Sequence, residues 1–322
     1  MEQGTQGQGE PLFSCRIDNA KVVTATLTCL SNGSKKDQLA QVEVNEDGIV
    51  FIVTGRAKFT QSQGTINRSL FQAFQCQPQG GRFTVDLNLL LECLQVFGAA
   101  SLASTMLTMS YEPNQAVLRL TLEEQGVLTT CDIHALEEGE DALDLAALAS
   151  AFRSSPEVLR AILKSEVLKE AISDLSDLPG AGSVRVAVAP QEPHFHLAAG
   201  GVYGALEIFL PRSSEAFVHF DCSEARAWSY GLGALNQGMR ALTVAKETYM
   251  RINEEGILCV QHQVENTASG HSTFIDFLCL AEETGEEEQR EQEEREEKEE
   301  EKGGESDAES MGGVQQGGGG FE

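Results

Sequence analysis

Short runs in which apolar and β-branched residues alternate with polar ones dominate the first 281 residues of this sequence. Each run is bounded by Gly, Asn or Asp, a pattern typical of strands that bury one face and end in tight turns. The runs predict twelve strands, at residues 39–44, 48–54, 82–85, 105–111, 116–122, 127–133, 184–189, 205–210, 216–221, 248–253, 257–264 and 274–280. We therefore expect an architecture in which β-structure predominates.

Three turns share one chemistry, an acidic pair and a glycine between two apolar runs. They lie at Asn45–Ile49, Glu123–Val127 and Asn253–Ile257. Glycine adopts positive φ at low cost, so each turn predicts a tight antiparallel hairpin. The recurrence indicates antiparallel meanders more than it establishes a duplicated domain.

Four short segments have the spacing of amphipathic helices, two in each half of the chain. The segments are 18–30, 87–97, 165–178 and 232–242. The first begins at an Asp/Asn cap, the second is capped by Asp86 and followed by Gly98, and Pro179 follows the third. The fourth contains Gly233 and Gly238, each of which costs ~1 kcal/mol relative to Ala in a helix interior.

The length of the chain predicts two domains, because domains usually contain ~100–200 residues. Residues 135–142 form an acidic, Gly-containing stretch without apolar periodicity, as expected of a linker. We expect a flexible N-terminus at 1–11, a first domain at 12–134, the interdomain linker at 135–142 and a second domain at 143–281. Residues 146–163 fit a helix by propensity, whereas Val158–Ile162 fit a strand equally well, so both remain open.

Charge divides the chain at residue 282. The formal charge is −27, and residues 282–322 contain 17 of the acidic and 4 of the basic residues. A segment so rich in Glu and Gly cannot bury enough apolar area to offset chain entropy, so we expect a disordered acidic and Gly-rich tail. The remaining chain is also acidic, which means that any contact with DNA requires a local basic surface.

Motifs of common catalytic sites are missing from the sequence. It contains no phosphate-binding loop, nucleophile elbow or His-Glu-x-x-His motif, and Gly231–Gly238 has the wrong spacing for a dinucleotide site. The eight cysteines are dispersed, so we expect reduced core thiols in an intracellular protein. His194 and His196 would share one strand face without a third ligand, so no metal or cofactor is expected. No apolar run is long enough to span a membrane.

Several segments carry a resemblance to a known family. They are Ser69–Gln75, Val85–Gly98, Leu120–Cys131 and Ser165–Ile172, with weaker support from Glu215–Phe220 and Ile257–Gln261. With two helices among antiparallel meanders in each half, the chain resembles sliding clamps of the PCNA type from about Phe13 to Glu282. Among these clamps it is similar to the Rad-one subunit family of the heterotrimeric DNA-damage checkpoint clamp.

The resemblance implies an α+β, two-domain PCNA-like sliding-clamp fold, with antiparallel sheets outside and four short helices lining the ring interior. It further implies a non-catalytic nuclear protein that encircles DNA at damage sites and recruits checkpoint and repair proteins. The implied partners are two other checkpoint-clamp subunits, a clamp loader and double-stranded DNA in the ring hole. No cofactor, small-molecule substrate or membrane is implied.

The resemblance also assigns candidate residues to these roles. The basic helix residues Lys21, Lys169 and Arg240 become DNA-facing candidates. Ring closure requires edge strands, which the resemblance places at 105–111 and 205–210, and the subunit-interface candidates are Leu107, Met109, Leu206 and Ile208. Partner peptides are expected at the linker, at Leu136, Glu137 and Glu138.

Two functions outside the clamp family also fit the residues. One is a β-rich cytosolic enzyme that uses Cys and His, which would require a perturbed thiol in a cleft. The other is an acidic adaptor protein, unrelated to clamps, whose tail binds a basic partner. Only the clamp hypothesis demands a complex with one copy each of three different subunits.

Deletion of residues 283–322 tests the expected independence of the tail. Because like charges keep the tail extended and away from the similarly acidic body, the shortened chain should fold and assemble normally. Only recruitment of partners should change. Circular dichroism and native mass spectrometry measure folding and assembly, and a truncated chain that fails at either would contradict the expectation.

Overall fold

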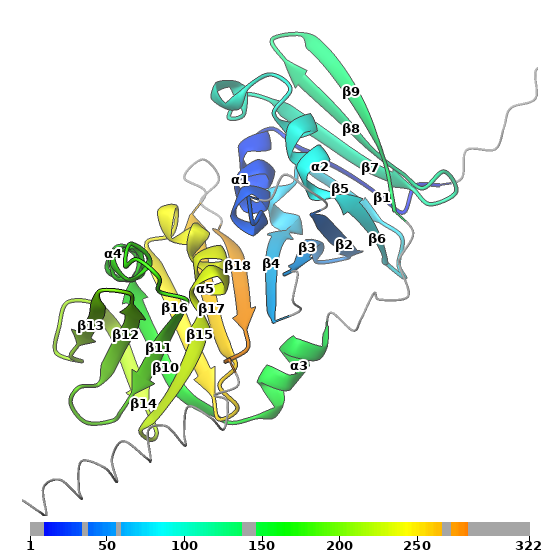
Figure 1. The fold of residues 1–322 in the computed structure, drawn as a ribbon. Coiled ribbons are helices and arrows are strands. Elements are labelled where there is room, and N and C mark those ends of the chain that lie inside the picture. Colours follow the sequence, from blue (N-terminus) through cyan, green and yellow to red (C-terminus); the bar gives the residue numbers. More distant parts are fainter. Residues whose placement is uncertain (1–9, 34–37, 56–58, 137–145, 266–271, 283–322) are drawn as a thin grey trace, which may run out of the picture. The chain divides into compact units, whose positions relative to one another are not determined.

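A computed structural model describes residues 10–33, 38–55, 59–136, 146–265 and 272–282 of the chain (Figure 1). Strands predominate in these ranges and the helices are short, which confirms the expected strand-rich α+β class. The strands of the first half are β1 (Phe13–Ile17), β2 (Leu39–Asn45), β3 (Gly48–Thr54), β4 (Thr60–Asn67), β5 (Ala73–Cys76), β6 (Gly81–Asp86), β7 (Met106–Glu112), β8 (Val117–Glu124) and β9 (Val127–His134). Those of the second half are β10 (Glu157–Lys164), β11 (Ser183–Val188), β12 (Phe195–Gly201), β13 (Gly204–Leu210), β14 (Phe217–Cys222), β15 (Arg226–Gly231), β16 (Glu247–Asn253), β17 (Leu258–Glu265) and β18 (Ser272–Cys279).

The strands form three antiparallel sheets. A five-stranded sheet, in the order β5-β1-β7-β8-β9, belongs to the first half, and a four-stranded sheet, β13-β12-β11-β15, belongs to the second. The third sheet has nine strands in the order β14-β10-β16-β17-β18-β4-β3-β2-β6. It therefore combines strands of both halves, which meet where β18 pairs with β4.

The three turns with an acidic pair and glycine form the predicted hairpins. They join β2 to β3, β8 to β9 and β16 to β17. In the second of them, Gln125 and Gly126 have φ values of 49° and 81°, the positive pair that defines a type I′ turn. This turn matches the right-handed twist of the flanking strands and sets the β8–β9 register.

Helices occupy few of the described residues. The α-helices are α1 (Ala20–Leu30), α2 (Leu87–Leu94), α3 (Ala146–Ser154), α4 (Ser165–Ser176) and α5 (Leu232–Gly238), and the 3-10 helices are η1 (Arg68–Leu70), η2 (Ala99–Ser101) and η3 (Met239–Thr243). The four predicted helices correspond to α1, α2, α4 and α5 with η3. The open segment 146–163 contains both predicted elements in succession, the helix α3 and then most of the strand β10.

Side-chain caps begin the two helices of the first half. The Asn19 side chain accepts a hydrogen bond from the backbone N–H of Lys21 at 3.0 Å, and Asp86 accepts one from Leu89 at 2.9 Å. Such caps satisfy backbone donors that a helix leaves free in its first turn. The cap residues therefore explain why these helices begin where the sequence pattern predicts.

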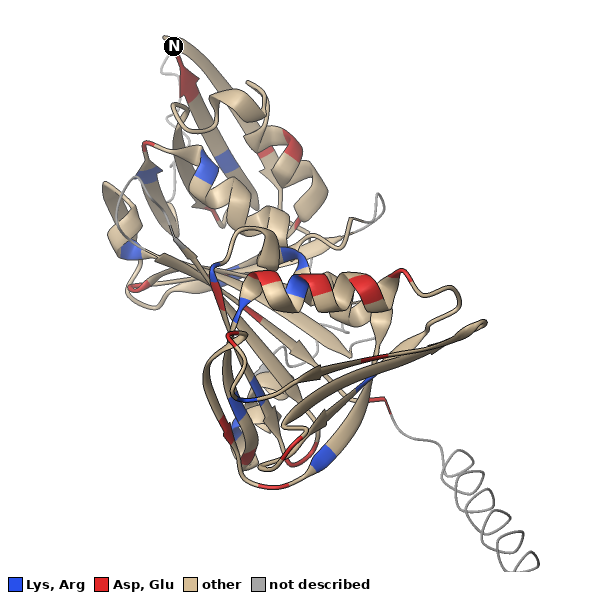
Figure 2. Cartoon of the chain, turned by 90° about the vertical axis from the view of Figure 1, so that its left-hand side faces the viewer, with Lys and Arg blue, Asp and Glu red and all other residues tan. Residues whose placement is uncertain are grey.

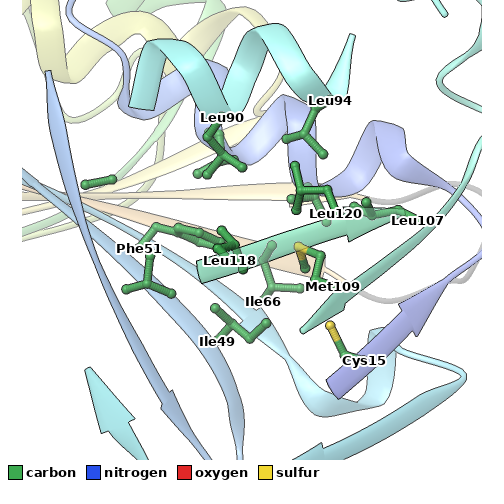
Figure 3. Packing of buried hydrophobic residues seen from close by; sticks show 14 of the residues in the cluster. Cys15, Ile49, Phe51, Ile66, Leu90, Leu94, Leu107, Met109, Leu118 and Leu120 are labelled. Carbon is green, nitrogen blue, oxygen red and sulfur yellow. The ribbon is translucent and has the colours of Figure 1, made fainter. Parts of the chain in front are cut away.

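Two hydrophobic cores lie on the face of the nine-stranded sheet that α1, α4 and α5 contact, and a smaller cluster around Phe152 of α3 packs against Ile257, Cys259 and Leu278. The first consists of residues between 12 and 133 together with Ala241 and Ile275, and the second of residues between 158 and 279. In the first core, Leu90 and Leu94 of α2 point toward the buried side chains of β7 and β8 (Figure 3). The division of the body into domains at 135–142 stays a prediction.

The expectation that residues 105–111 form an edge strand is wrong. Strand β7 lies between β1 and β8, with Leu107 opposite both Ile17 and Leu122. Leu107 and Met109, the two proposed interface residues, are 0% and 2% exposed and belong to the first core. Alternation of apolar residues reveals one buried face, and interior and edge strands both have one, so the pattern does not distinguish them.

Gly238, which weakens the sequence signal for α5, allows this helix to approach β18 closely. A Cβ atom at this position would overlap the ring of Phe277. Gly64 has the same role in β4, where a Cβ would lie 2.6 Å from Thr26 Cγ2 of α1. Close contact between helices and the central strands therefore requires glycine at both positions.

A buried chain of hydrogen bonds joins elements of the second half. His262 Nε2 lies 3.1 Å from the Gly238 carbonyl oxygen, Nδ1 lies 3.0 Å from Thr248 Oγ1, and that hydroxyl lies 2.8 Å from Ser165 Oγ. Because the carbonyl can only accept, Nε2 carries the proton and Nδ1 accepts from Thr248. A neutral imidazole therefore completes every hydrogen bond in this buried series. Burial disfavours the charged form and lowers the pKa of His262 to about 4.

This shift predicts acid sensitivity between pH 6.5 and 4. The unfolded chain binds a proton at His262 near pH 6.5, whereas the folded chain binds it only near pH 4. The contribution of neutral His262 to the free energy of unfolding is thus fully present above pH 6.5 and is lost as the pH falls to 4. The total loss is about 3 kcal/mol. Urea unfolding of His262→Gln should show a shallower pH dependence than the wild type. The exposed His219→Gln is the control, and an unchanged slope for His262→Gln would contradict the assignment.

Candidate functional site

The helices of both halves lie side by side along one row. Helix α1 contacts α2 on one side and α5 and η3 on the other, and η3 in turn contacts α4 (Figure 1). This row brings together polar faces from residues far apart in the sequence. It contains all three basic residues predicted to face DNA.

Lys21 and Arg240 line the same cavity between the two halves. The cavity has a volume of about 550 Å³, within the range of small-ligand sites. Both basic side chains are exposed, and threonines and small apolar residues complete its wall. The lining residues are Lys21, Thr24, Ala25, Thr28, Cys29, Gln95, Ala99, Leu102, Arg240, Thr243 and Val244.

Arg240 reaches from η3 to the loop that follows α1. Its Nη2 atom lies 2.6 Å from the position that a Cβ atom of Gly33 would occupy. The last turn of α1 contains no basic residue, so this guanidinium supplies positive charge near the negative end of the helix dipole. Burial raises the pKa of Cys29 in this helix to about 11, and the Arg240 charge opposes that rise.

Lys169 lies apart from this pair, on the exposed face of α4. The same face carries Glu166, Glu170, Asp174 and, at the helix end, Asp177, all of them exposed. Figure 2 shows how few Lys and Arg residues interrupt the acidic residues along the helices facing the viewer. The positive field of the helix row is therefore concentrated at Lys21 and Arg240.

Two strands that end sheets expose apolar side chains. Strand β13 ends the four-stranded sheet, as expected, and on it Leu206 and Ile208 are half-buried whereas Phe209 is 51% exposed. In the first half the corresponding end is β9, where Val127 and Leu128 are 56% and 64% exposed. The apolar pattern of residues 127–133 does not mark β9 as an edge, whereas its place as the last strand before the linker is a signal for one.

The described part of the linker begins along β6. Leu136 is 44% exposed, and its backbone N–H donates to the carbonyl of Thr84 at 2.8 Å. Glu137 and Glu138, the other residues proposed to receive partner peptides, lie outside the described residues. Peptide binding at the linker therefore stays a prediction.

Thiol chemistry offers little support for a cysteine enzyme. Burial raises the pKa of Cys15 to about 12 and of Cys29 and Cys259 to about 11, and it also raises those of Cys76 and Cys222. A nucleophilic cysteine requires the opposite shift, because the thiolate is the reactive form. These thiols therefore have the character of core residues.

Across the described ranges, no three His, Cys, Asp or Glu side chains are grouped so that they could hold a metal ion. The described helices include none with the length and apolarity needed to cross a membrane. His196 of the predicted histidine pair stacks on Phe209 with ring centroids 4.3 Å apart, and His194 accepts a hydrogen bond from the Arg212 backbone. Each histidine thus has a local structural partner.

The arrangement of sheets and helices places the chain in the class of proteins with the PCNA-like fold. The crystal structure of Proliferating Cellular Nuclear Antigen from Entamoeba histolytica has a TM-score of 0.67 with this chain. The match covers 85% of this chain and 100% of the Entamoeba histolytica chain. Because the sequence identity is 12%, the likeness concerns the fold. Within this class, residues 12–264 match the family described as Repair protein Rad1/Rec1/Rad17, and the chain belongs to that family.

Individual relatives extend over most of the chain. Cell cycle checkpoint protein RAD1 of Mus musculus is 31% identical over 234 residues, which is 72% of this chain and 80% of the relative. Its Homo sapiens counterpart is 29% identical over the same shares. DNA damage checkpoint control protein rad1 of Schizosaccharomyces pombe is 23% identical and covers 83% of this chain and 85% of its own length.

The place of β7 inside its sheet and of β9 at the edge predicts effects of very different size for two leucines. Leu107→Ala should lower the free energy of unfolding by about 2–5 kcal/mol, because it leaves a cavity in the first core. Leu128→Ala on β9 should change it by less than about 0.5 kcal/mol, because the side chain is exposed. Urea denaturation measures both, and equal effects would argue against the strand order described above.

Proposed function

We propose that this chain is a non-catalytic subunit of a heterotrimeric ring that encircles DNA at sites of damage and recruits checkpoint and repair proteins. The observation that carries the proposal is the match to the Rad1/Rec1/Rad17 family over residues 12–264 of a chain with the clamp fold. The relatives are named as a cell cycle checkpoint protein and as a DNA damage checkpoint control protein, which favours action in the nucleus. Two other clamp subunits and a clamp loader are the expected partners.

Ring closure would use strand pairing at β9 and β13. Each of these strands has one neighbour in its sheet, so half of its backbone groups point away from that sheet. The type I′ turn makes Glu124 and Val127 a hydrogen-bonded pair, and the alternation of the ladder then directs the N–H of Thr130 outward. Exposed apolar side chains beside both edges add area for a neighbouring subunit to bury.

Contact with DNA would rest on the helix row and require no base-specific groups. Lys21 and Arg240 offer two positive charges at one cavity, where phosphate oxygens are suitable partners. The acidic residues of α4 oppose wider attraction. Retention on DNA would therefore depend on ring closure, with this pair adding a modest, sequence-independent contribution.

The proposal that the chain is not an enzyme has support from the thiols and from the character of the cavity. The thiols discussed above have raised pKa values, which makes them poor nucleophiles near neutral pH. Among the described residues that line the cavity, Lys21 and Arg240 are the charged ones, and none of these residues supplies a carboxylate or imidazole for acid–base chemistry. A scaffold that acts by encirclement needs neither.

A proline at residue 130 tests the proposed edge. Thr130→Pro removes the outward N–H while leaving the ladder to β8 intact, and proline is tolerated on edge strands. We expect weaker assembly with the two other clamp subunits, measured by native mass spectrometry as loss of the 1:1:1 complex, and an unchanged unfolding midpoint.

Thr130→Ala is the matched control, because it removes the same side chain and keeps the N–H. It should assemble like the wild type. Heterotrimer formation by Thr130→Pro at wild-type affinity would refute the use of β9 as a ring edge, and failure of the wild type to form any heterotrimer would refute the proposed function.

A second test concerns the basic pair at the cavity. In the assembled ring, Lys21→Ala with Arg240→Ala should reduce the slope of log affinity for duplex DNA against log salt by about 1 for each phosphate interaction that the substitutions remove. Arg160→Ala is the control, because its side chain is exposed on the sheet face opposite the first and second cores. A double variant with the wild-type salt dependence would show that Lys21 and Arg240 are ordinary surface charges.

A further inference from the structure

Two cysteines from different elements meet beside the first core. Cys93 lies on α2 and Cys131 on β9, both are half-buried, and both pack against the same hydrophobic cluster. The helix and the strand that carry them contact each other, and the Cys131 thiol is close enough to contribute to the raised pKa of Cys93. Their proximity belongs to the folded chain, since 37 residues separate them in the sequence.

The strand register explains why the thiols meet. Cys131 is directly opposite Leu120 of β8, and residues opposite each other in an antiparallel pair point to the same face of the sheet. Leu94 of α2 points toward Leu120 on that face (Figure 3). Cys93 precedes Leu94 on a helix that contacts both β8 and β9, so its thiol is placed above the neighbouring strand.

We propose that Cys93 and Cys131 form a dithiol site that low-molecular-weight disulfides, such as glutathione disulfide, convert into an intramolecular disulfide. This inference goes beyond the proposed function and does not depend on ring assembly. The covalent bond would tie α2 to the edge strand β9.

The exchange proceeds in two balanced steps. The thiolate of Cys131 attacks one sulfur of glutathione disulfide, whose S–S bond breaks and releases one glutathione thiolate. The thiolate of Cys93 then attacks the Cys131 sulfur of the mixed disulfide and releases the second glutathione. The two protein thiols are oxidised, one disulfide is reduced to two thiols, and the two protons lost by the protein are taken up by the departing glutathiones.

Proximity, rather than an activated thiolate, would drive the second step. Burial, together with the neighbouring Cys131, raises the pKa of Cys93 to about 11, so the thiol form predominates at neutral pH. We therefore expect slow exchange at neutral pH that accelerates in alkaline buffer. A dithiol of this kind should also bind a trivalent arsenical, because phenylarsine oxide joins two adjacent thiols with release of one water.

The test uses the full-length chain equilibrated with glutathione disulfide at pH 8.5, alkylated with N-ethylmaleimide and digested without reduction. Peptide mass spectrometry should find one main cross-linked product, between the Cys93 and Cys131 peptides. In parallel, native mass spectrometry should find one phenylarsine adduct per chain. Both products should disappear in Cys93→Ser and in Cys131→Ser.

The half-buried Cys76 and Cys222 supply matched controls, because each donates to a backbone carbonyl, at 3.3 Å and 3.1 Å, instead of to another thiol. Cys76→Ser and Cys222→Ser should retain the cross-link and the adduct. Alkylation or glutathionylation of both Cys93 and Cys131 without a cross-linked peptide in the folded wild type would overturn the proposal. So would cross-links distributed evenly among the eight cysteines.

Discussion

Backbone pairing between β4 and β18 is the interaction on which the rest of the structure depends. Six residue pairs, from Phe274 opposite Thr65 to Cys279 opposite Thr60, join the two halves into one nine-stranded sheet. The continuous sheet holds α1 of the first half against α5 and η3 of the second. The helix row and the cavity at Lys21 and Arg240 are consequences of this one strand pair.

The same strand pair shows where prediction from sequence ends. Strand β4 has the sequence Thr-Gln-Ser-Gln-Gly-Thr-Ile-Asn and no apolar alternation, so it was not among the twelve predicted strands. Its residues Thr60, Gln61 and Ser62 are nevertheless buried, because β3, β18 and α1 surround the strand. A strand that is paired on both sides is held by backbone hydrogen bonds and does not require alternating apolar side chains. A local sequence pattern does not show which strands will provide those hydrogen bonds.

Local features, by contrast, were predictable. Caps at Asn19 and Asp86 and the Gln125-Gly126 turn act through backbone groups within a few residues, so their effects follow from the sequence directly. The basic residues Lys21 and Arg240 were recognisable as surface charges on helices, but their shared cavity depends on the β4–β18 pairing. The prediction that residues 105–111 form an edge strand is wrong for the same reason, because strand order is a long-range property.

Under the proposed function, the acidic character of the helix row is compatible with a clamp because encirclement and attraction are separate physical effects. A closed ring stays on DNA until it opens, whatever its electrostatic affinity, whereas each phosphate contact adds drag and salt dependence. Glu166, Glu170 and Asp174 on α4 would repel the duplex from that part of the wall, while Lys21 and Arg240 attract it at the junction of the halves. Among the described residues of the helix row, contact with DNA would therefore centre on Lys21 and Arg240, where both halves contribute positive charge.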